Sequence, residues 1–201
     1  MNRTILLLGI ADVFFVTGFG LIDPILAIFI KEELVGATII SVGIATALFL
    51  LVKSCVQLPF SRYIDAHDDH RKWIITGSFV VAVVPLLYLS ATSISLIYVA
   101  QILLGLGSGI TYPAWLGLWS KSLDSDHQSF EWSLYSTATG LATALTAAIG
   151  AIIAQYLGFT ITFLIVTFLA LVGSSFLFGL EHKRITKVKI KPHTVKSVRG
   201  M

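Results

Sequence analysis

The segment GFGLIDP, residues 18–24, returns 89 positions later as GSGITYP, residues 107–113. Both segments read Gly, any residue, Gly, an apolar residue, two further residues and Pro, and both lie inside long apolar runs. Glycine and proline weaken the interior of a helix. Their recurrence therefore predicts two helices interrupted at corresponding places, at Gly18, Gly20, Pro24, Gly107, Gly109 and Pro113.

The composition around these segments is typical of a membrane protein. Of the 201 residues, 56% are hydrophobic and 12% are charged, against roughly 45–50% and 25% in soluble domains. Six apolar segments approach the ~20 residues that cross a bilayer as a helix, over 4–30, 38–60, 73–91, 95–119, 132–156 and 159–180. We therefore predict an all-α integral membrane protein, with six transmembrane helices in one bundle over 1–181 and a basic, disordered tail over 182–201.

The distribution of Lys and Arg predicts the orientation of this bundle. With six spans, both termini and the loops 61–72 and 120–131 share one side, which holds every basic residue outside the spans except Lys31. Under the positive-inside rule that side is cytoplasmic. We expect a multi-pass protein of the plasma (inner) membrane with both termini in the cytoplasm.

The offset between the two glycine-rich segments predicts an internal symmetry. Because three helices per unit reverse the direction of the chain, the first segment runs outward and the fourth runs inward. Two inverted three-helix repeats are a common design of transporters, in which corresponding broken helices lie near the substrate.

Four of the six segments carry polar residues along one face. Asp12 and Asp23 are 11 residues apart, which leaves them about 20° apart around a helix. Because unpaired polar groups in lipid are costly, we expect the first, second, fourth and fifth segments to face protein or water, and the third and sixth to face lipid. The candidate substrate or coupling residues are Asp12, Lys53, Gln57, Gln101, Ser108, Tyr112 and Trp115.

Asp12 and Lys53 both lie roughly 12 to 14 Å from the predicted cytoplasmic side at about 1.5 Å per residue, and we expect them to form an ion pair. Intramembrane ionisable residues are functional candidates by default. Either residue could exchange a proton during transport, or the pair could be purely structural. Asp23, just before Pro24, is expected to be interfacial or a local cap.

Two motifs give these features a family resemblance. SRYIDAHDDHRKW, residues 61–73, is similar to the loop motif of the major facilitator superfamily, with Asp65 at its acidic position and Arg71 and Lys72 at its basic end. QILLGLGSG, residues 101–109, is similar to the helix 4 motif of that family, with Gln101 replacing the usual Arg. The chain thus resembles the N-terminal six-helix half of such a transporter. The resemblance implies a cavity lined by the first and fourth helices, and a gating role for the loop.

A lone bundle is half of such a transporter, so we predict that two copies pair in parallel as a homodimer. This half-size secondary transporter would move a small organic solute by alternating access, with protons as a candidate coupling ion. Two acids and several aromatic residues suit a cationic or amphipathic substrate, whereas Lys53 suits an anion equally well. Three alternatives remain open: a fragment of a longer transporter, the substrate-binding subunit of an energy-coupling importer, and a non-transporting structural membrane protein.

The motifs that identify other classes of function are absent from the sequence. The sequence contains no phosphate-binding loop, no nucleophile beside a base and no nucleic-acid module, so we expect no enzyme activity, no cofactor and no nucleic-acid partner. His67, Asp68, Asp69 and His70 are close in sequence but lack ordered metal-ligand spacing. We interpret them as a solvated turn and predict no metal site.

Overall fold

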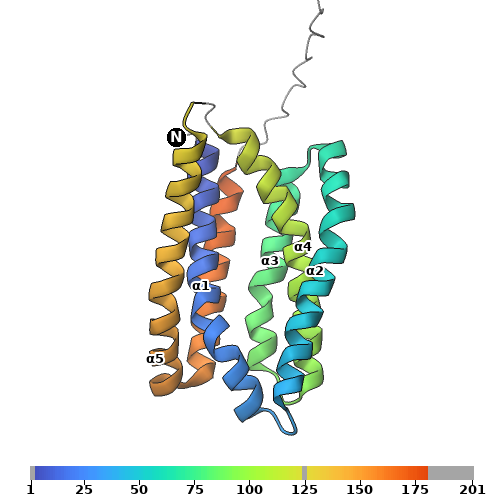
Figure 1. Cartoon of the computed structure of the whole chain (residues 1–201), viewed down its shortest axis with the longest axis vertical. Coiled ribbons are helices and arrows are strands. Elements are labelled where there is room, and N and C mark those ends of the chain that lie inside the picture. The colour runs from blue at the N-terminus through green and yellow to red at the C-terminus, as the bar shows by residue number, and fades with distance from the viewer. Residues whose placement is uncertain (1–2, 124–125, 181–201) are drawn as a thin grey trace, which may run out of the picture.

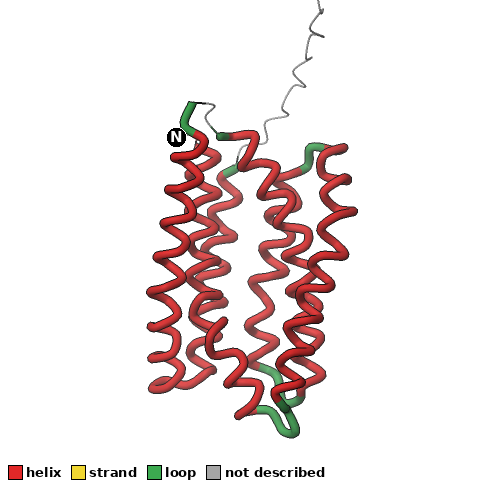
Figure 2. Tube along the Cα trace, viewed as in Figure 1, coloured by secondary structure: helices red, strands yellow, loops and turns green. Residues whose placement is uncertain are grey.

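The computed structural model describes residues 3–123 and 126–180, which are nearly all helical (Figures 1 and 2). Each of the five long helices is long and apolar enough to cross a membrane. A 3₁₀ turn, η1 (Leu177–Gly179), closes the described part of the chain. The helices are α1 (Arg3–Glu33), α2 (Ile39–His67), α3 (His70–Leu89), α4 (Ile94–Ser122) and α5 (Gln128–Phe176). The all-α membrane fold is thereby confirmed, whereas the predicted tail over 182–201 lies outside the described residues.

The fifth and sixth predicted segments form the two arms of α5, residues 128–157 and 159–176. Gly158 between them has φ 83° and ψ 166°, which are not helical values, and Figure 1 shows the chain reversing at the end of the first arm. Tyr135 in the first arm and Gly173 in the second both contact the Ala11–Asp12 turn of α1. The five helices therefore hold the six predicted segments, the last two as the arms of α5.

We expect Gly158→Ala to destabilise the protein by about 1–3 kcal/mol, because only glycine adopts this backbone region without strain. No atom lies within 4 Å of a Cβ built at Gly158, so the cost comes from conformation alone. A lower apparent melting temperature in lipid discs would show it. Gly43→Ala is the matched control, since Gly43 in α2 has equally open surroundings and alanine favours a helix. Equal melting temperatures for the two variants would contradict a sharp turn at Gly158.

The helix α2 extends beyond its predicted end. It begins at a capping box, in which the Ser41 N–H donates to Thr38 Oγ1 (3.3 Å) and the Thr38 N–H donates to Ser41 Oγ (3.1 Å). It ends where Asp68 adopts a left-handed conformation with φ 55°. Residues 61–67 contain no glycine or proline, so nothing stops the helix earlier.

This extension corrects the predicted loop over 61–72. Only Asp68 and Asp69 separate α2 from α3. Asp65 therefore lies in the last two turns of α2, and Arg71 and Lys72 lie in the first turn of α3.

The helices α1 and α4 run unbroken through the two repeated segments, which corrects the prediction of interrupted helices. Pro24 and Pro113 lie inside them. The glycines instead allow other helices to approach closely. Their nearest neighbours are Val166 for Gly18, Thr146 for Gly20, Val81 for Gly107, and Val56 with the Lys53 backbone for Gly109.

Burial in the bundle differs from the predicted order of helices. In α2 only Ala45 and Ile64 are buried, whereas α3 contains nine buried residues. The ring of Tyr88 in α3 lies 5.7 Å from that of Phe163 in the second arm of α5. The third segment, expected to face lipid, thus contributes strongly to the core. Apolar composition alone cannot separate the two environments, because lipid is as apolar as a protein interior.

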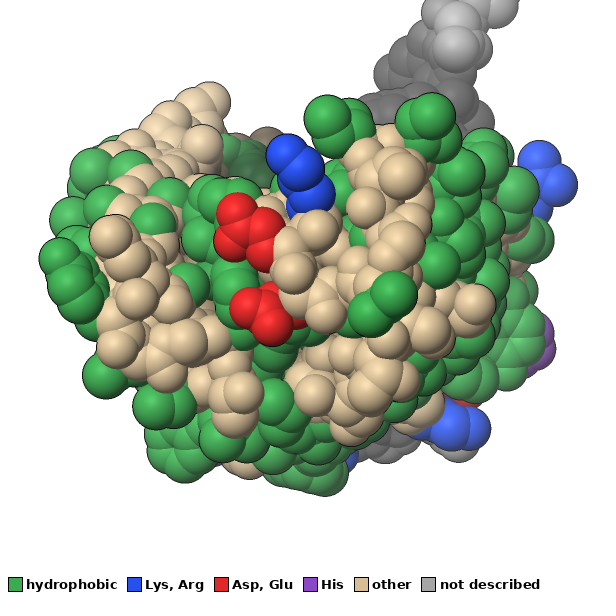
Figure 3. All heavy atoms as spheres, turned by 90° about the horizontal axis from the view of Figure 1, so that it is seen from below, with side chains coloured by type: hydrophobic (Ala, Val, Ile, Leu, Met, Phe, Trp, Pro, Cys, Tyr) green, Lys and Arg blue, Asp and Glu red, His purple; other side chains and the backbone are tan. Residues whose placement is uncertain are grey.

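The two ends of the bundle differ in charge. The N-terminus, the α2–α3 turn and the α4–α5 connection lie at one end (Figure 1). At the opposite end, Figure 3 shows a small group of acidic and basic side chains near the centre of the face. The helix α1 finishes there in Lys31, Glu32 and Glu33. Among the described residues, five Lys and Arg residues lie at the end that carries the N-terminus and only Lys31 lies at the other; the five are Arg3, Arg62, Arg71, Lys72 and Lys121.

Candidate functional site

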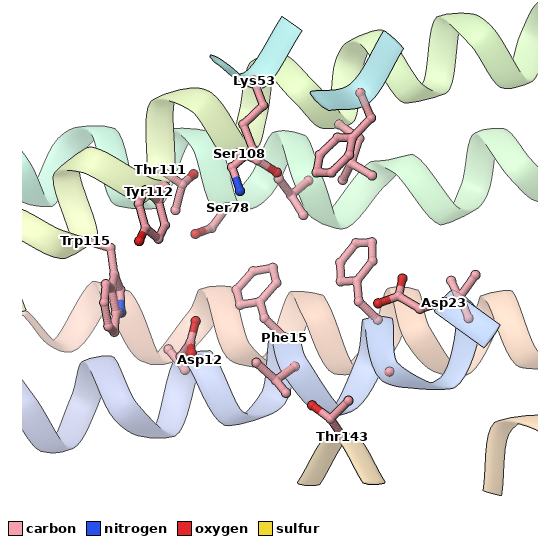
Figure 4. A pocket seen from close by; sticks show the side chains of 18 of the residues that line it. Asp12, Phe15, Asp23, Lys53, Ser78, Ser108, Thr111, Tyr112, Trp115 and Thr143 are labelled. Atoms are coloured by element: carbon pink, nitrogen blue, oxygen red, sulfur yellow. The ribbon is translucent and has the colours of Figure 1, made fainter. Parts of the chain in front are cut away.

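A cavity of about 690 Å³ lies between α1 and the group formed by α2, α3 and α4 (Figure 4). Its size falls within the ~300–1,000 Å³ of small-molecule sites. Six of the seven predicted substrate or coupling residues line it, namely Asp12, Lys53, Gln101, Ser108, Tyr112 and Trp115. Gln57 lies one turn beyond Lys53 in α2 and is not part of the lining, and of the repeated glycines and prolines only Gly20 is.

The contribution of α4 to this cavity mirrors that of α1. Each of the six lining residues of α4 lies 89 positions after a lining residue of α1. The pairs are Asp12 with Gln101, Phe15 with Leu104, Phe19 with Ser108, Ile22 with Thr111, Asp23 with Tyr112, and Leu26 with Trp115. The offset between GFGLIDP and GSGITYP therefore also relates two walls of one cavity.

Asp12 is held by a residue that the sequence analysis missed. Its Oδ2 accepts a hydrogen bond of 2.5 Å from the hydroxyl of Tyr135, in the first arm of α5. The Tyr135 ring packs with three indole rings at centroid distances of 4.8–6.0 Å, those of Trp115, Trp119 and Trp132. Packing therefore fixes the hydroxyl that orients the carboxylate.

Lys53 faces Asp12 from the opposite wall without pairing with it. Within residues 3–123 and 126–180 no ion pair joins the two side chains. The Lys53 Nζ instead lies 5.1 Å from the centroid of the Tyr112 ring and 5.8 Å from that of Phe49. In Figure 4 the cavity separates the lysine from the aspartate. The predicted ion pair is therefore not formed, because the two helices stand on either side of the hollow.

Asp23 and Tyr88 also line the cavity. Asp23 lies toward the end of the cavity opposite Asp12 (Figure 4). It is therefore part of the cavity and not only of the interface. The indole N–H of Trp115 and the hydroxyl of Tyr88 are buried and have no hydrogen-bond partner among the described residues. A buried donor without a partner costs about 1–3 kcal/mol. Both residues line the cavity, so each brings an unused donor close to it.

The predicted gating residues lie at the end that carries the N-terminus. Asp68 has two partners there: the Lys121 Nζ donates to its Oδ1 (2.8 Å), and the His70 Nδ1 lies 3.2 Å from the same atom. Arg71 donates to the carbonyl oxygen of Phe178 (2.8 Å).

These contacts also correct the predicted solvated turn around His70. Its side chain is only 3% exposed and lies against Gly117 of α4. The Lys72 Nζ lies 5.1 Å from the centroid of the Trp73 ring. The cluster therefore links α2, α3 and α4 at one end of the bundle.

We expect Tyr135→Phe to lower the stability of the protein by about 1–3 kcal/mol, because it leaves the Asp12 carboxylate without its donor in a partly buried site. The ring packing is retained. An apparent melting temperature in lipid discs measures the effect. The control is Tyr156→Phe, in the same arm, where the side chain is 76% exposed and no change is expected. A Tyr135→Phe protein as stable as this control would mean that the hydrogen bond contributes nothing.

A helical bundle with a polar cavity between α1 and α4 is an arrangement typical of membrane transporters. The chain matches the model of the Major Facilitator Superfamily over residues 8–200. It belongs to that superfamily, and is thus an integral membrane protein of a transporter family.

Two relatives share part of this chain. The proton-coupled antiporter flippase LtaA of Staphylococcus saprophyticus is 28% identical over 102 residues, which cover 50% of this chain and 26% of the relative. The voltage-gated purine nucleotide uniporter SLC17A9 of Homo sapiens is 30% identical over 80 residues, covering 39% of this chain and 18% of the relative. The chain therefore spans about a quarter or less of these relatives.

A solved structure shares the fold. The crystal structure of an auto-inhibited POT family peptide transporter superposes with a TM-score of 0.75 at 14% sequence identity, covering 88% of this chain and 37% of that one. At this identity the likeness concerns the fold alone.

Proposed function

We propose that this chain is one six-helix half of a secondary active transporter for a small organic solute. It would work by alternating access against a second bundle, for which we propose a parallel copy of the same chain. The single observation that carries this proposal is the cavity, with its two walls related by the 89-residue offset.

The glycine contacts support two inverted repeats. If residues 3–89 and 94–176 are the two repeats, Gly18 and Gly107 each contact the third helical segment of the other repeat, through Val166 and Val81. Gly20 and Gly109 each contact its second segment, through Thr146 and Val56. Reciprocal contacts of this kind are expected when two units of opposite direction pack around one axis.

The exposed helices support a second bundle. In α2 and in the first arm of α5 most side chains are exposed, and both helices flank the cavity. In a membrane such faces contact either lipid or another protein. Because the cavity is lined by one bundle only, a second bundle against these faces would enclose the solute. A longer chain containing this bundle would supply it covalently.

The charge distribution supports an orientation with both termini in the cytoplasm, as the positive-inside rule requires. Parallel pairing would keep this bias in both copies. Proton coupling is also part of the proposal, because Asp12 is an ionisable group in a cavity-lining helix and is oriented by a hydroxyl. Such groups often form proton relays in transporters.

Native mass spectrometry from lipid discs, followed by flux assays in proteoliposomes, would test the proposal. We expect dimers, and solute flux that responds to an imposed pH gradient. Monomers alone would contradict the paired arrangement. Co-purification of an ATPase would favour an energy-coupling importer, and a protein without flux for any solute that binds would favour a structural role.

A further inference from the structure

We propose that the cavity binds a zwitterionic solute, with its cationic group against α1, its anionic group against α2 and α4, and an apolar body between them. The inference names a substrate class for the proposed transporter, and its role in the cell rests on that proposed function. Binding itself can be measured without transport.

The α1 wall of the cavity is acidic. Asp12 and Asp23 lie 11 residues apart, which is about 16 Å along a helix, and both line the cavity. None of the lining residues of α1 is basic. The corresponding positions on α4 are the neutral residues Gln101 and Tyr112. The negative charge is therefore confined to one of the two symmetry-related walls.

The opposite wall offers donors and a positive charge. Lys53 reaches into the cavity from α2, near Ser108 in Figure 4. The Trp115 side chain is 8% exposed and its N–H has no partner among the described residues. No lining residue of α2, α3 or α4 is Asp or Glu. This wall thus suits a carboxylate or another anionic group.

Both walls also carry apolar and aromatic surface. Phe15 and Phe19 of α1, Phe49 of α2 and the Tyr112 ring of α4 line the cavity. The charges on the two walls do not neutralise each other directly, since Asp12 and Lys53 form no ion pair. Charges inside a membrane span are costly unless compensated. A cation alone would leave Lys53 without an opposite charge, and an anion alone would leave both aspartates without one, whereas a zwitterion places an opposite charge against each wall.

Isothermal titration calorimetry of the full chain in lipid discs would test this inference. The probes are ω-amino acids from 4-aminobutanoate to 8-aminooctanoate, each compared with the n-alkylamine and the n-alkanoate of the same carbon number. Empty discs correct for partition into lipid. At one or more lengths we expect the zwitterion to bind at least about tenfold more tightly than both controls. This matches the loss of one hydrogen bond to a charged group, worth roughly 1.5–3 kcal/mol.

Variants assign the two ends of the probe. Lys53→Gln is expected to weaken binding of the ω-amino acid and the alkanoate but not of the alkylamine. Asp23→Asn is expected to weaken the ω-amino acid and the alkylamine but not the alkanoate. Glu33→Gln, at the exposed end of α1 and outside the cavity lining, is the matched control and should bind like the parent protein. The comparison of probes on the parent protein holds even if a variant fails to fold.

Equal or tighter binding of either singly charged series would overturn the inference, as would no binding at any length. Zwitterion binding without flux in proteoliposomes would leave the inference standing and contradict the proposed transport. Flux of a singly charged solute, with no zwitterion binding, would support the proposed transport and overturn this inference.

Discussion

Gly150→Ala is expected to destabilise the bundle by on the order of 3 kcal/mol, the upper part of the range for overpacking. A Cβ at Gly150 would collide with the carbonyl oxygen, the Cα and the carbonyl carbon of Leu21 in α1. Backbone atoms cannot rotate away as a side chain can. The first arm of α5 and α1 would therefore have to separate, and close packing along their shared length would be lost.

The apparent melting temperature of the purified protein in lipid discs would report this loss. Gly140→Ala is the matched control, because Gly140 lies in the same arm with no atom within 4 Å of a Cβ placed there. Its alanine should be neutral or slightly stabilising, by up to about 1 kcal/mol. Equal apparent melting temperatures for the two variants would mean that α1 and α5 are packed less closely than the Gly150–Leu21 contact requires.

This pair of glycines shows what the sequence could and could not predict about packing. In the sequence, Gly140 and Gly150 share a face of small residues with Ser136, Thr143 and Ala147, and such a face is typical of close approach by another helix. Only Gly150 makes the approach. Which glycine is used depends on where α1 crosses the arm, and no local pattern encodes a crossing point between residues some 130 positions apart.

The same reasoning explains the errors in the fold. Hydropathy predicted the spans well, because length and apolarity are local properties. It predicted α3 to face lipid, because a charge-free segment fits lipid and protein interior equally. The recurrence of glycine and proline predicted breaks in the first and fourth segments. In the structure neighbouring helices use those glycines for contact, and both helices accommodate their prolines.

In the candidate site, polarity within apolar segments was enough to find Asp12, Lys53 and four of the six lining residues of α4, namely Gln101, Ser108, Tyr112 and Trp115. It was not enough to find Tyr135 and Tyr88, because their rings fit an apolar pattern and only the folded chain brings them to the cavity. Tyr135 and Asp12 are 123 residues apart. Offsetting the predicted Ser108 and Tyr112 by 89 would have indicated Phe19 and Asp23 as cavity residues from the sequence alone.

Asp12→Asn is expected to lower solute flux in proteoliposomes by about 10- to 100-fold, as expected for loss of a charged hydrogen-bond partner. Asparagine keeps the shape of aspartate, and its carbonyl oxygen can still accept from the Tyr135 hydroxyl. It cannot carry a negative charge or exchange a proton. The variant therefore removes the charge while preserving the contact between α1 and α5.

Flux of the best ω-amino acid probe, measured with and without a pH gradient, would test this expectation. Glu33→Gln is again the control and should transport normally. Tyr135→Phe makes the opposite change, since it keeps the charge and loses the hydrogen bond, so it should reduce stability more than Asp12→Asn does. Normal flux through Asp12→Asn would reduce the Asp12–Tyr135 pair to a structural contact, because a coupling group cannot lose its charge without affecting transport.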